Sequence, residues 1–117
     1  MTRRRVLVAS EPMEYGVLSY LERLFDGLDP TRWELALAFS PHRMAPQAQR
    51  LLGRLVRDGI RVRELPFRRS IGLGDAAAVT ALLAETDSFR PDLLHLHSTK
   101  AGVVGRLVAR MRGVPAL

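Results

Sequence analysis

Four short strand-like runs, three of them mainly apolar and one alternating between apolar and charged residues, are separated by longer segments whose apolar residues recur every three or four positions. This pattern limits the fold more than any other feature. The strand-like runs are residues 5–10, 33–39, 60–65 and 93–97. The segments with helical spacing are residues 17–28, 46–58, 75–87 and 99–112. Four βα units with short connections predict an α/β fold: a doubly wound, Rossmann-like parallel sheet with helices on both faces.

The order of the strands follows from the rules that govern such connections. Right-handed crossovers predict the strand order 3-2-1-4, which places the first and fourth strands side by side. Residues 113–117 then resemble the approach to a fifth strand that is cut off. Ligands of these sheets bind outside the carboxyl ends of the strands, at the point where the order reverses. Residues 10–16 and 97–102 are therefore expected to line the ligand crevice.

The composition excludes several classes of protein. A chain of 117 residues, 47% of them hydrophobic, forms one domain over residues 1–117 with a core of its own. No apolar run approaches the roughly 18 residues of a membrane span, and the apolar stretch behind the basic start is too short for a signal peptide. The absence of cysteine excludes disulfides and thiolate metal sites. These features predict a cytoplasmic protein.

The net charge of +6 is concentrated in one segment. Residues 41–70 hold eight arginines and two acidic residues, a difference of +6, and their only aromatic residue is Phe67. Nucleic-acid surfaces interleave basic with aromatic side chains, so no nucleic acid is expected as a partner. Arg50, Arg54 and Arg57 form one stripe of a predicted helix. This stripe is either a solvated outer face or a contact for anionic lipid at the cytoplasmic face of a membrane.

The first predicted loop, EPMEYG, ends at a glycine that opens the following helix. Gly16 would let the N–H groups of that helix start approach an anion such as a phosphate. The alternative is a turn glycine with no ligand. Neither the G-x-G-x-x-G fingerprint nor the G-x-x-x-x-G-K-[ST] motif occurs, so dinucleotide binding and P-loop hydrolysis lose most of their support.

The stretch LLHLHSTKAG carries most of the remaining candidate chemistry. His95 and His97 point to the same face of a strand because side chains alternate along it. His95, among leucines, is expected in the core, whereas His97 at the strand's end either contacts a ligand or is structural. The hydroxyl of Ser98 or Thr99 is expected to cap the next helix. Lys100 opposes the dipole of that helix, a cost that a bound anion would offset.

No metal is expected from these residues. His95 and His97 would need at least a third ligand, and only His42 and scattered carboxylates remain.

Other residues predict helix boundaries and contacts. Asp75 is predicted to be the N-cap of the third helix. Gly102 and Gly105 are expected to allow close packing of the last helix on the sheet. Gly113 is a natural terminator of that helix.

Two longer stretches carry a family resemblance. RPDLLHLHSTKAGVVGRLVARMRGVP (90–115) and GIRVRELPFRRSIGLGDAAAVTALL (59–83) resemble segments of the N-terminal domain of family 4 glycosyltransferases, retaining enzymes of the two-domain GT-B fold. The resemblance covers essentially the whole chain. The first loop of the family usually carries two adjacent glycines, whereas this chain has Tyr15-Gly16, so only Gly16 matches the pattern.

The resemblance implies a function and its division between domains. The N-terminal domain shapes the acceptor side of a cleft, and a C-terminal domain absent from this chain binds most of the nucleotide-sugar donor. No catalytic residue is then expected within this chain, and no cofactor or metal. The substrates would be a nucleotide sugar and a glycan, lipid-linked or small-molecule acceptor. The substrate-contacting residues expected here are Tyr15, Gly16, His97, Ser98 and Lys100.

Two alternatives remain beside this interpretation. A GT-B-like sugar-nucleotide epimerase shares the domain and the cleft. A non-catalytic, flavodoxin-like binding or regulatory module would share only the doubly wound sheet.

Overall fold

A computed structural model describes residues 3–66 and 74–117 of the chain. Its elements are β1 (Arg4–Met13), α1 (Tyr15–Gly27), β2 (Trp33–Met44), α2 (Pro46–Arg57), β3 (Arg61–Glu64), α3 (Gly74–Phe89), β4 (Leu93–His97) and α4 (Thr99–Arg112). The strands form one parallel sheet in the order β3-β2-β1-β4. The predicted fold class and strand order are confirmed. The segment RRSIGLG (68–74), whose polar and glycine residues predict a loop, lies outside the described residues except for Gly74.

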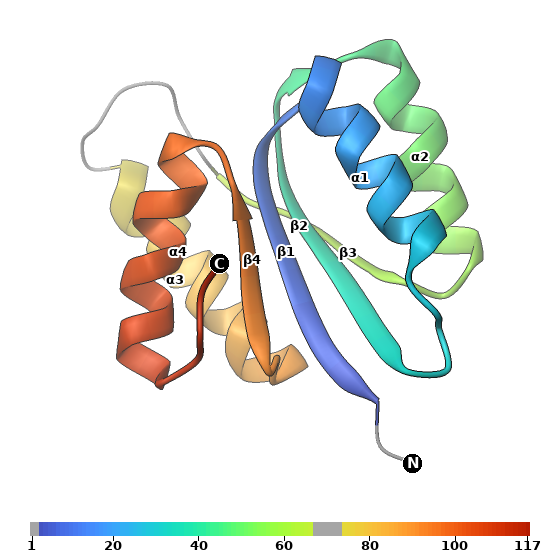
Figure 1. Cartoon of the computed structure of the whole chain (residues 1–117). Coiled ribbons are helices and arrows are strands. Elements are labelled where there is room, and N and C mark those ends of the chain that lie inside the picture. The colour runs from blue at the N-terminus through green and yellow to red at the C-terminus, as the bar shows by residue number, and fades with distance from the viewer. Residues whose placement is uncertain (1–2, 67–73) are drawn as a thin grey trace.

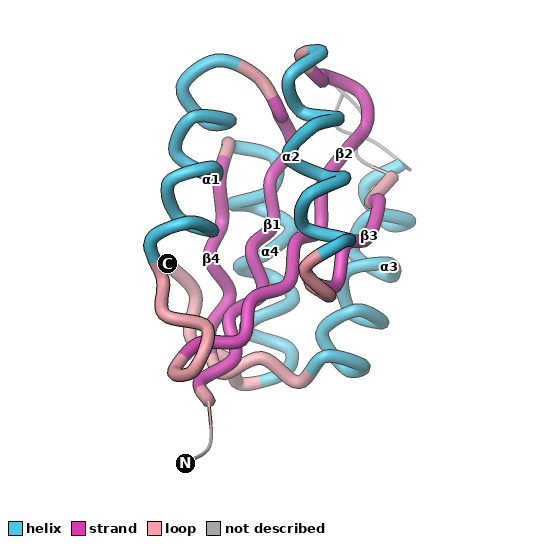
Figure 2. Tube along the Cα trace, turned by 90° about the vertical axis from the view of Figure 1, so that its right-hand side faces the viewer, coloured by secondary structure: helices cyan, strands magenta, loops and turns pink. Residues whose placement is uncertain are grey.

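The sheet separates two helical layers, with α1 and α2 on one face and α3 and α4 on the other (Figure 1). Seen from the side of α1 and α2, the strands lie behind these two helices, and α3 and α4 lie behind the strands (Figure 2). Val6 and Val8 of β1 are buried with the residues of the first layer. Leu7 and Ala9 are buried with those of the second. Because the central strands are covered on both faces, their sequences are continuously apolar.

β1 and β2 extend beyond their apolar runs. The predicted strands end at Ser10 and Phe39, but the observed strands continue to Met13 and Met44. Their register shifts after Ser10, and Met13 then pairs with Met44. An irregularity of this kind lets polar residues and a proline continue an otherwise apolar strand. The prediction that residues 11–13 form a loop is therefore wrong.

β3 lies at the edge of the sheet and turns its arginines toward α3. Arg61 forms an ion pair with Glu85, and Arg63 reaches the same carboxylate at 3.5 Å. The Glu85 side chain is only 7% exposed. A carboxylate at such a site needs charged partners to offset its desolvation, which explains the alternation of valine and arginine in this short strand.

α3 begins at Gly74, one residue earlier than predicted. Asp75 therefore lies in the first turn of the helix rather than at its N-cap, and that prediction is wrong. The Asp75 carboxylate accepts a hydrogen bond of 2.6 Å from Lys100 Nζ on α4. A contact between residues 25 positions apart cannot be recognised from capping signals.

The end of the chain pairs with β4 as the beginning of a fifth strand would. Gly113 closes α4 at a φ of +67°, the left-handed conformation predicted for a terminating glycine. Beyond it, Leu94 N donates to Pro115 O at 2.9 Å and Leu117 N donates to Leu94 O at 2.8 Å. Leu94 and Ala116 form a parallel bridge.

The two glycines of α4 differ in what surrounds them. A Cβ on Gly105 would lie 3.0 Å from Leu96 Cγ and closer still to both Leu96 methyl groups. A Cβ on Gly102 would meet only the end of the Arg106 side chain, at 3.0 Å. Close packing of helix on sheet is therefore confirmed at Gly105 and is not what Gly102 provides.

Candidate functional site

The carboxyl ends of β1 and β4 lie side by side at one edge of the sheet. Ser10 pairs with His97 at the end of the shared ladder. From β1 the chain proceeds to β2 and β3 on one side, while β4 lies on the other, so the strand order reverses between these two ends. α1 follows one strand and α4 the other. This is the place where doubly wound sheets bind their ligands.

Both strand ends lead into a residue with a backbone conformation that glycine favours. Tyr15 has a φ of +52°. Ser98 has a φ of +87° and a ψ of 161°, a backbone conformation that residues other than glycine rarely adopt. Each such residue costs on the order of 1–3 kcal/mol, and such residues cluster at functional sites. The candidate site is thus held by two strained residues, Tyr15 and Ser98.

Tyr15 and Gly16 open α1 with little of the protein around them. The Tyr15 side chain is 84% exposed. A Cβ on Gly16 would meet no described atom within 4 Å, and the positive φ of this turn belongs to Tyr15 rather than to Gly16. Neither steric room nor backbone conformation within the described chain requires glycine at position 16. The described structure thus gives no internal reason for glycine at position 16, and a ligand contact there stays a prediction.

Of the two hydroxyl residues predicted to cap α4, Ser98 is the N-cap. Its hydroxyl oxygen accepts a hydrogen bond of 3.2 Å from Ala101 N. The cap satisfies one of the N–H groups that a helix start leaves without an intrahelical partner.

His95 and His97 form a ring cluster with Tyr20 of α1. The two imidazoles stack with centroids 4.6 Å apart, and Tyr20 lies 5.9 Å from His95 and 4.9 Å from His97. The shared face of the two histidines is confirmed. His95 is only half-buried, so its expected place in the core is wrong. Sequence reasoning missed Tyr20, because the register between α1 and β4 is set by tertiary packing.

The environment of the two imidazoles favours their neutral form. Burial lowers the pKa of His95 below its usual 6.5. Burial lowers the pKa of His97 as well, and the neighbouring His95 lowers it further. His97 Nε2 is buried and has no hydrogen-bond partner among the described residues. A neutral His97 at this edge can accept or donate one hydrogen bond to a substrate hydroxyl.

We expect acidification from about pH 7.5 to about pH 5.5 to lower the urea midpoint of unfolding. As the pH falls through 6.5, the unfolded chain binds protons before the folded His95 and His97 do, so stability is lost until the lowered pKa values are passed. The shifted carboxyls Asp29 and Asp87 titrate below 3.8 and do not contribute in this window. His95→Asn/His97→Asn should flatten the dependence. If the urea midpoint of that variant depended on pH as strongly as that of the wild type, the two histidines would not be the cause of the dependence.

Lys100 has an internal partner. Its side chain is 10% exposed and forms the 2.6 Å ion pair with Asp75. Glu11, Asp75 and Lys100 line one groove of about 390 Å³ between α3 and α4, so two carboxylates face one ammonium there. The carboxylate of Asp75 offsets the cost of a cation at the helix start without a bound anion. A substrate contact by Lys100 stays a prediction.

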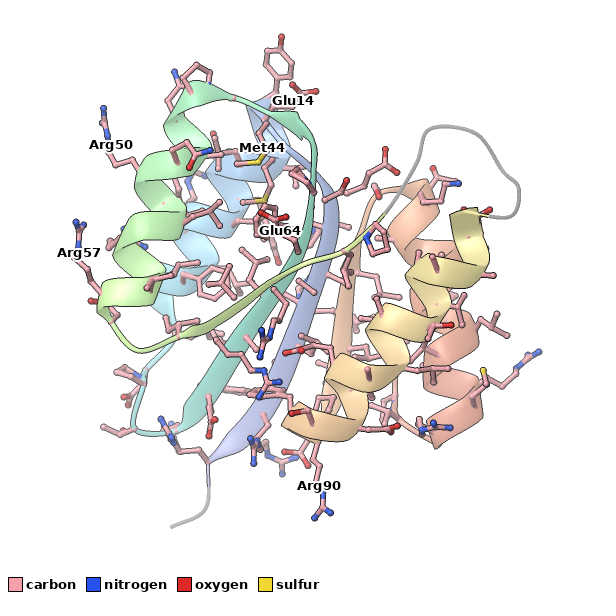
Figure 3. The ribbon with its side chains drawn as sticks, turned by 180° about the vertical axis from the view of Figure 1, so that it is seen from behind. Glu14, Met44, Arg50, Arg57, Glu64 and Arg90 are labelled. Atoms are coloured by element: carbon pink, nitrogen blue, oxygen red, sulfur yellow. The ribbon has the colours of Figure 1, made fainter. Side chains whose placement is uncertain are left out.

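The arginines of α2 lie away from this edge. Arg54 Nη2 pairs with Asp26 Oδ1 of α1 at 2.9 Å. Arg50 and Arg57 project outward from α2 (Figure 3). An ion pair to the neighbouring helix and two solvent-exposed guanidinium groups favour the solvated outer face over the lipid contact. The lipid contact of this stripe was not confirmed.

In the part of the chain that the structure describes, no three His, Asp or Glu side chains gather where they could hold a metal ion. Over the same residues, no helix has both the length and the apolarity of a membrane span.

Comparisons with solved structures identify the fold. MurG of Acinetobacter baumannii matches with a TM-score of 0.65 at 15% identity, over 97% of this chain and 33% of MurG. The UDP-GlcNAc 2-epimerase of Neisseria meningitidis, solved with UDP-GlcNAc, matches with a TM-score of 0.62 at 15% identity, over 96% of this chain and 31% of the epimerase. A deacetylase of teicoplanin biosynthesis matches with a TM-score of 0.58 at 13% identity, over 96% of this chain and 65% of the deacetylase.

These matches span proteins of different activities, so they show the fold alone. The chain spans about a third of the length of MurG and of the epimerase. No curated protein sequence matches it.

The family follows from the sequence as a whole. Residues 15–117 match the glycosyl transferase 4-like domain, which covers both stretches that resemble family 4 glycosyltransferases. The chain therefore belongs to the glycosyl transferase 4-like family and has the fold of an N-terminal GT-B domain.

Proposed function

We propose that this chain forms the acceptor-side domain of a glycosyltransferase that transfers a sugar from a nucleotide-sugar donor. The observation that carries the proposal is the pair of strained residues, Tyr15 and Ser98, at adjacent strand ends of a glycosyl transferase 4-like domain. Tyr15 and Gly16 would contact substrate from the start of α1. His97 and Ser98 would do so from the end of β4. Lys100 would contribute to the same edge through the groove it lines.

The donor would be held mainly by a second domain. In a two-domain fold the carboxyl edge of this sheet faces the partner domain across the cleft, and residues 1–117 supply no catalytic group. The UDP-GlcNAc bound to the Neisseria epimerase makes uridine diphosphate sugars the first donors to test. No metal or other cofactor is required, and the reaction would take place in the cytoplasm, where nucleotide sugars are made.

We expect residues 1–117 alone to catalyse no glycosyl transfer, because the donor site and the catalytic groups lie outside them. Release of uridine diphosphate from UDP-GlcNAc, followed with a coupled assay, measures this directly. The full-length protein supplied with acceptors is the positive control. Turnover of any nucleotide sugar by the isolated domain would contradict the proposed division of labour.

An epimerase is the second candidate, supported by the TM-score of 0.62 to the Neisseria enzyme. The two activities differ in products. With UDP-GlcNAc and no acceptor, an epimerase converts one nucleotide sugar into another and releases no uridine diphosphate. A transferase releases the diphosphate when an acceptor is added. Chromatography of the nucleotide products with and without acceptor therefore separates the two.

A further inference from the structure

We propose that the groove between α3 and α4 is a subsite for a sugar or cyclitol ring that carries a protonated amine. The inference rests on the proposed function, because it assigns the groove to the acceptor of the glycosyl transfer. This α3–α4 groove has a volume of about 390 Å³. The sites of small-molecule ligands fall in this size range.

The α3–α4 groove adjoins the candidate site at the carboxyl edge of the sheet. Glu11 lines the groove and directly follows Ser10, which pairs with His97 at the end of the ladder between β1 and β4. Thr99 also lines the groove and directly follows the strained Ser98. A ring bound in the groove would therefore lie beside the strand ends to which the acceptor is assigned.

Glu11 occupies a position where the alternation of β1 predicts an apolar residue. Leu7 and Ala9 point to the α3–α4 layer and are fully buried. Glu11 is the next residue on this face and is 9% exposed. The register between β1 and β2 shifts at this position, between Ser10 and Pro12. Such irregularities re-aim side chains next to active sites, and residues that break a local pattern are expected at functional sites.

The charge of the groove lining is negative. The described charged residues that line it are Glu11, Asp75 and Lys100, two carboxylates and one ammonium. Asp75 accepts a hydrogen bond of 2.6 Å from Lys100 Nζ. A carboxylate offers about four lone-pair sites, so both can keep their internal contacts and still accept a hydrogen bond from a ligand. Because unbalanced negative charge is costly to bury, a ligand cation would stabilise this lining.

An aliphatic wall continues the groove away from the charged end. It consists of Val79 from α3 and of Val103 and Leu107 from α4. Val103 and Leu107 are 66% and 48% exposed, so a ligand can reach both side chains. The C–H faces of sugar and cyclitol rings pack on aliphatic groups, while the substituents at the ring edge form hydrogen bonds. A mainly apolar lining with a few polar groups is typical of a ligand site.

The sign of the charge selects the class of acceptor. A phosphorylated ring would bring its anion beside two carboxylates, whereas a protonated amine donates its N–H groups to them. Hydrogen bonds between charged groups are roughly twice as strong as those between neutral groups. The α3–α4 groove therefore favours an amino sugar or an aminocyclitol over a neutral ring, and a neutral ring over a phosphorylated one.

Three monosaccharides of different charge test this order. Glucosamine is a cation at about pH 6.5, where an amine of this kind is protonated, while N-acetylglucosamine is neutral and glucose 6-phosphate is an anion. Saturation-transfer NMR titrations with the 117-residue chain measure their dissociation constants. We expect glucosamine to bind at least about tenfold more tightly than N-acetylglucosamine. Glucose 6-phosphate should bind most weakly, and added salt should reduce the advantage of glucosamine.

Matched variants assign the binding to the groove. Glu11→Gln keeps the shape of the side chain and should lower the affinity for glucosamine about tenfold without changing that for N-acetylglucosamine. Asp75→Asn tests the second carboxylate in the same way. Glu64→Gln is the control, because Glu64 ends β3 at the same edge of the sheet, outside the groove lining (Figure 3). Val103→Ser/Leu107→Ser should weaken both sugars equally. Circular dichroism checks that each variant folds.

Several results would overturn the proposal: no binding of glucosamine, tighter binding of glucose 6-phosphate than of glucosamine, or equal losses in Glu11→Gln and Glu64→Gln. The proposed function is tested separately with the full-length protein. Transfer to neutral acceptors but not to amine-bearing ones would refute the assignment of the groove and retain the transferase. Binding of glucosamine by the groove without nucleotide release for any acceptor would retain the amine site and refute the transferase.

Discussion

Replacing Gly105 with valine should lower the free energy of unfolding by about 3 kcal/mol, because overpacking a close-packed core costs 1–3 kcal/mol and occasionally more. A Cβ at this position already falls within 3.0 Å of Leu96 Cγ and closer to its methyl groups. The branched side chain would push α4 away from β4. Urea unfolding followed by circular dichroism measures the loss.

Gly102→Ala is the matched control in the same helix. Its Cβ would meet only the flexible end of Arg106, and alanine is the better helix former by about 1 kcal/mol. We expect this variant to be as stable as the wild type or more so. A second control adds Leu96→Ala to Gly105→Ala, since the smaller neighbour removes the clash and the two substitutions should be less than additive. A Gly105→Val protein of unchanged stability would refute the close approach of α4 to β4.

The sheet was predictable because its rules act on patterns that the sequence displays. Continuous apolar runs such as residues 6–9 indicate strands covered on both faces, and right-handed crossovers leave few possible orders for four βα units. The position of the candidate site followed from the order alone. Once the first and fourth strands are neighbours, residues 10–16 and 97–102 meet at one edge.

What the sequence could not predict depends on tertiary neighbours. Gly102 and Gly105 are the same residue type three positions apart, and only the orientation of α4 on β4 shows that one of them meets Leu96. Lys100 looked like an anion contact because the carboxylate of Asp75, 25 residues away, could not be placed beside it. The extension of β2 depends on pairing with a partner strand rather than on its own residues.

The two strained residues, Tyr15 and Ser98, were only partly predictable from the sequence. Tyrosine and serine give no sign of a positive φ, so Ser98 could not be identified from its own chemistry. The family resemblance did contain a signal at Tyr15. Family 4 enzymes usually have glycine at that position, and the φ of +52° is one that glycine adopts without cost. A departure from a glycine pattern therefore predicts local strain.

Replacing both strained residues with glycine should make the protein more stable and less active. Tyr15→Gly/Ser98→Gly relieves two conformations that cost on the order of 1–3 kcal/mol each. The gain is reduced by the greater freedom of glycine in the unfolded chain, about 0.4–1 kcal/mol per site, and by the lost Ser98 cap, a few tenths of a kcal/mol. We expect a net gain of about 2 kcal/mol in the free energy of unfolding.

Activity should change in the opposite direction. If the strain holds the two helix starts in the geometry that substrate requires, glycine lets both turns relax into other conformations. We expect kcat/KM for the acceptor, measured at saturating nucleotide sugar, to fall about tenfold, which corresponds to 1.4 kcal/mol in the transition state. Urea unfolding and nucleotide release by the full-length protein measure the two effects on one sample.

Arg90→Gly separates this effect from a general response to strain relief. Arg90 has a φ of +55°, but it precedes β4 at the opposite end of the sheet from Glu14 and the start of α1 (Figure 3). Its replacement should raise stability and leave kcat/KM unchanged. Equal losses of activity in both variants would mean that the enzyme is sensitive to rigidity anywhere. A more stable double variant with full activity would mean that the strain at Tyr15 and Ser98 has no part in binding substrate.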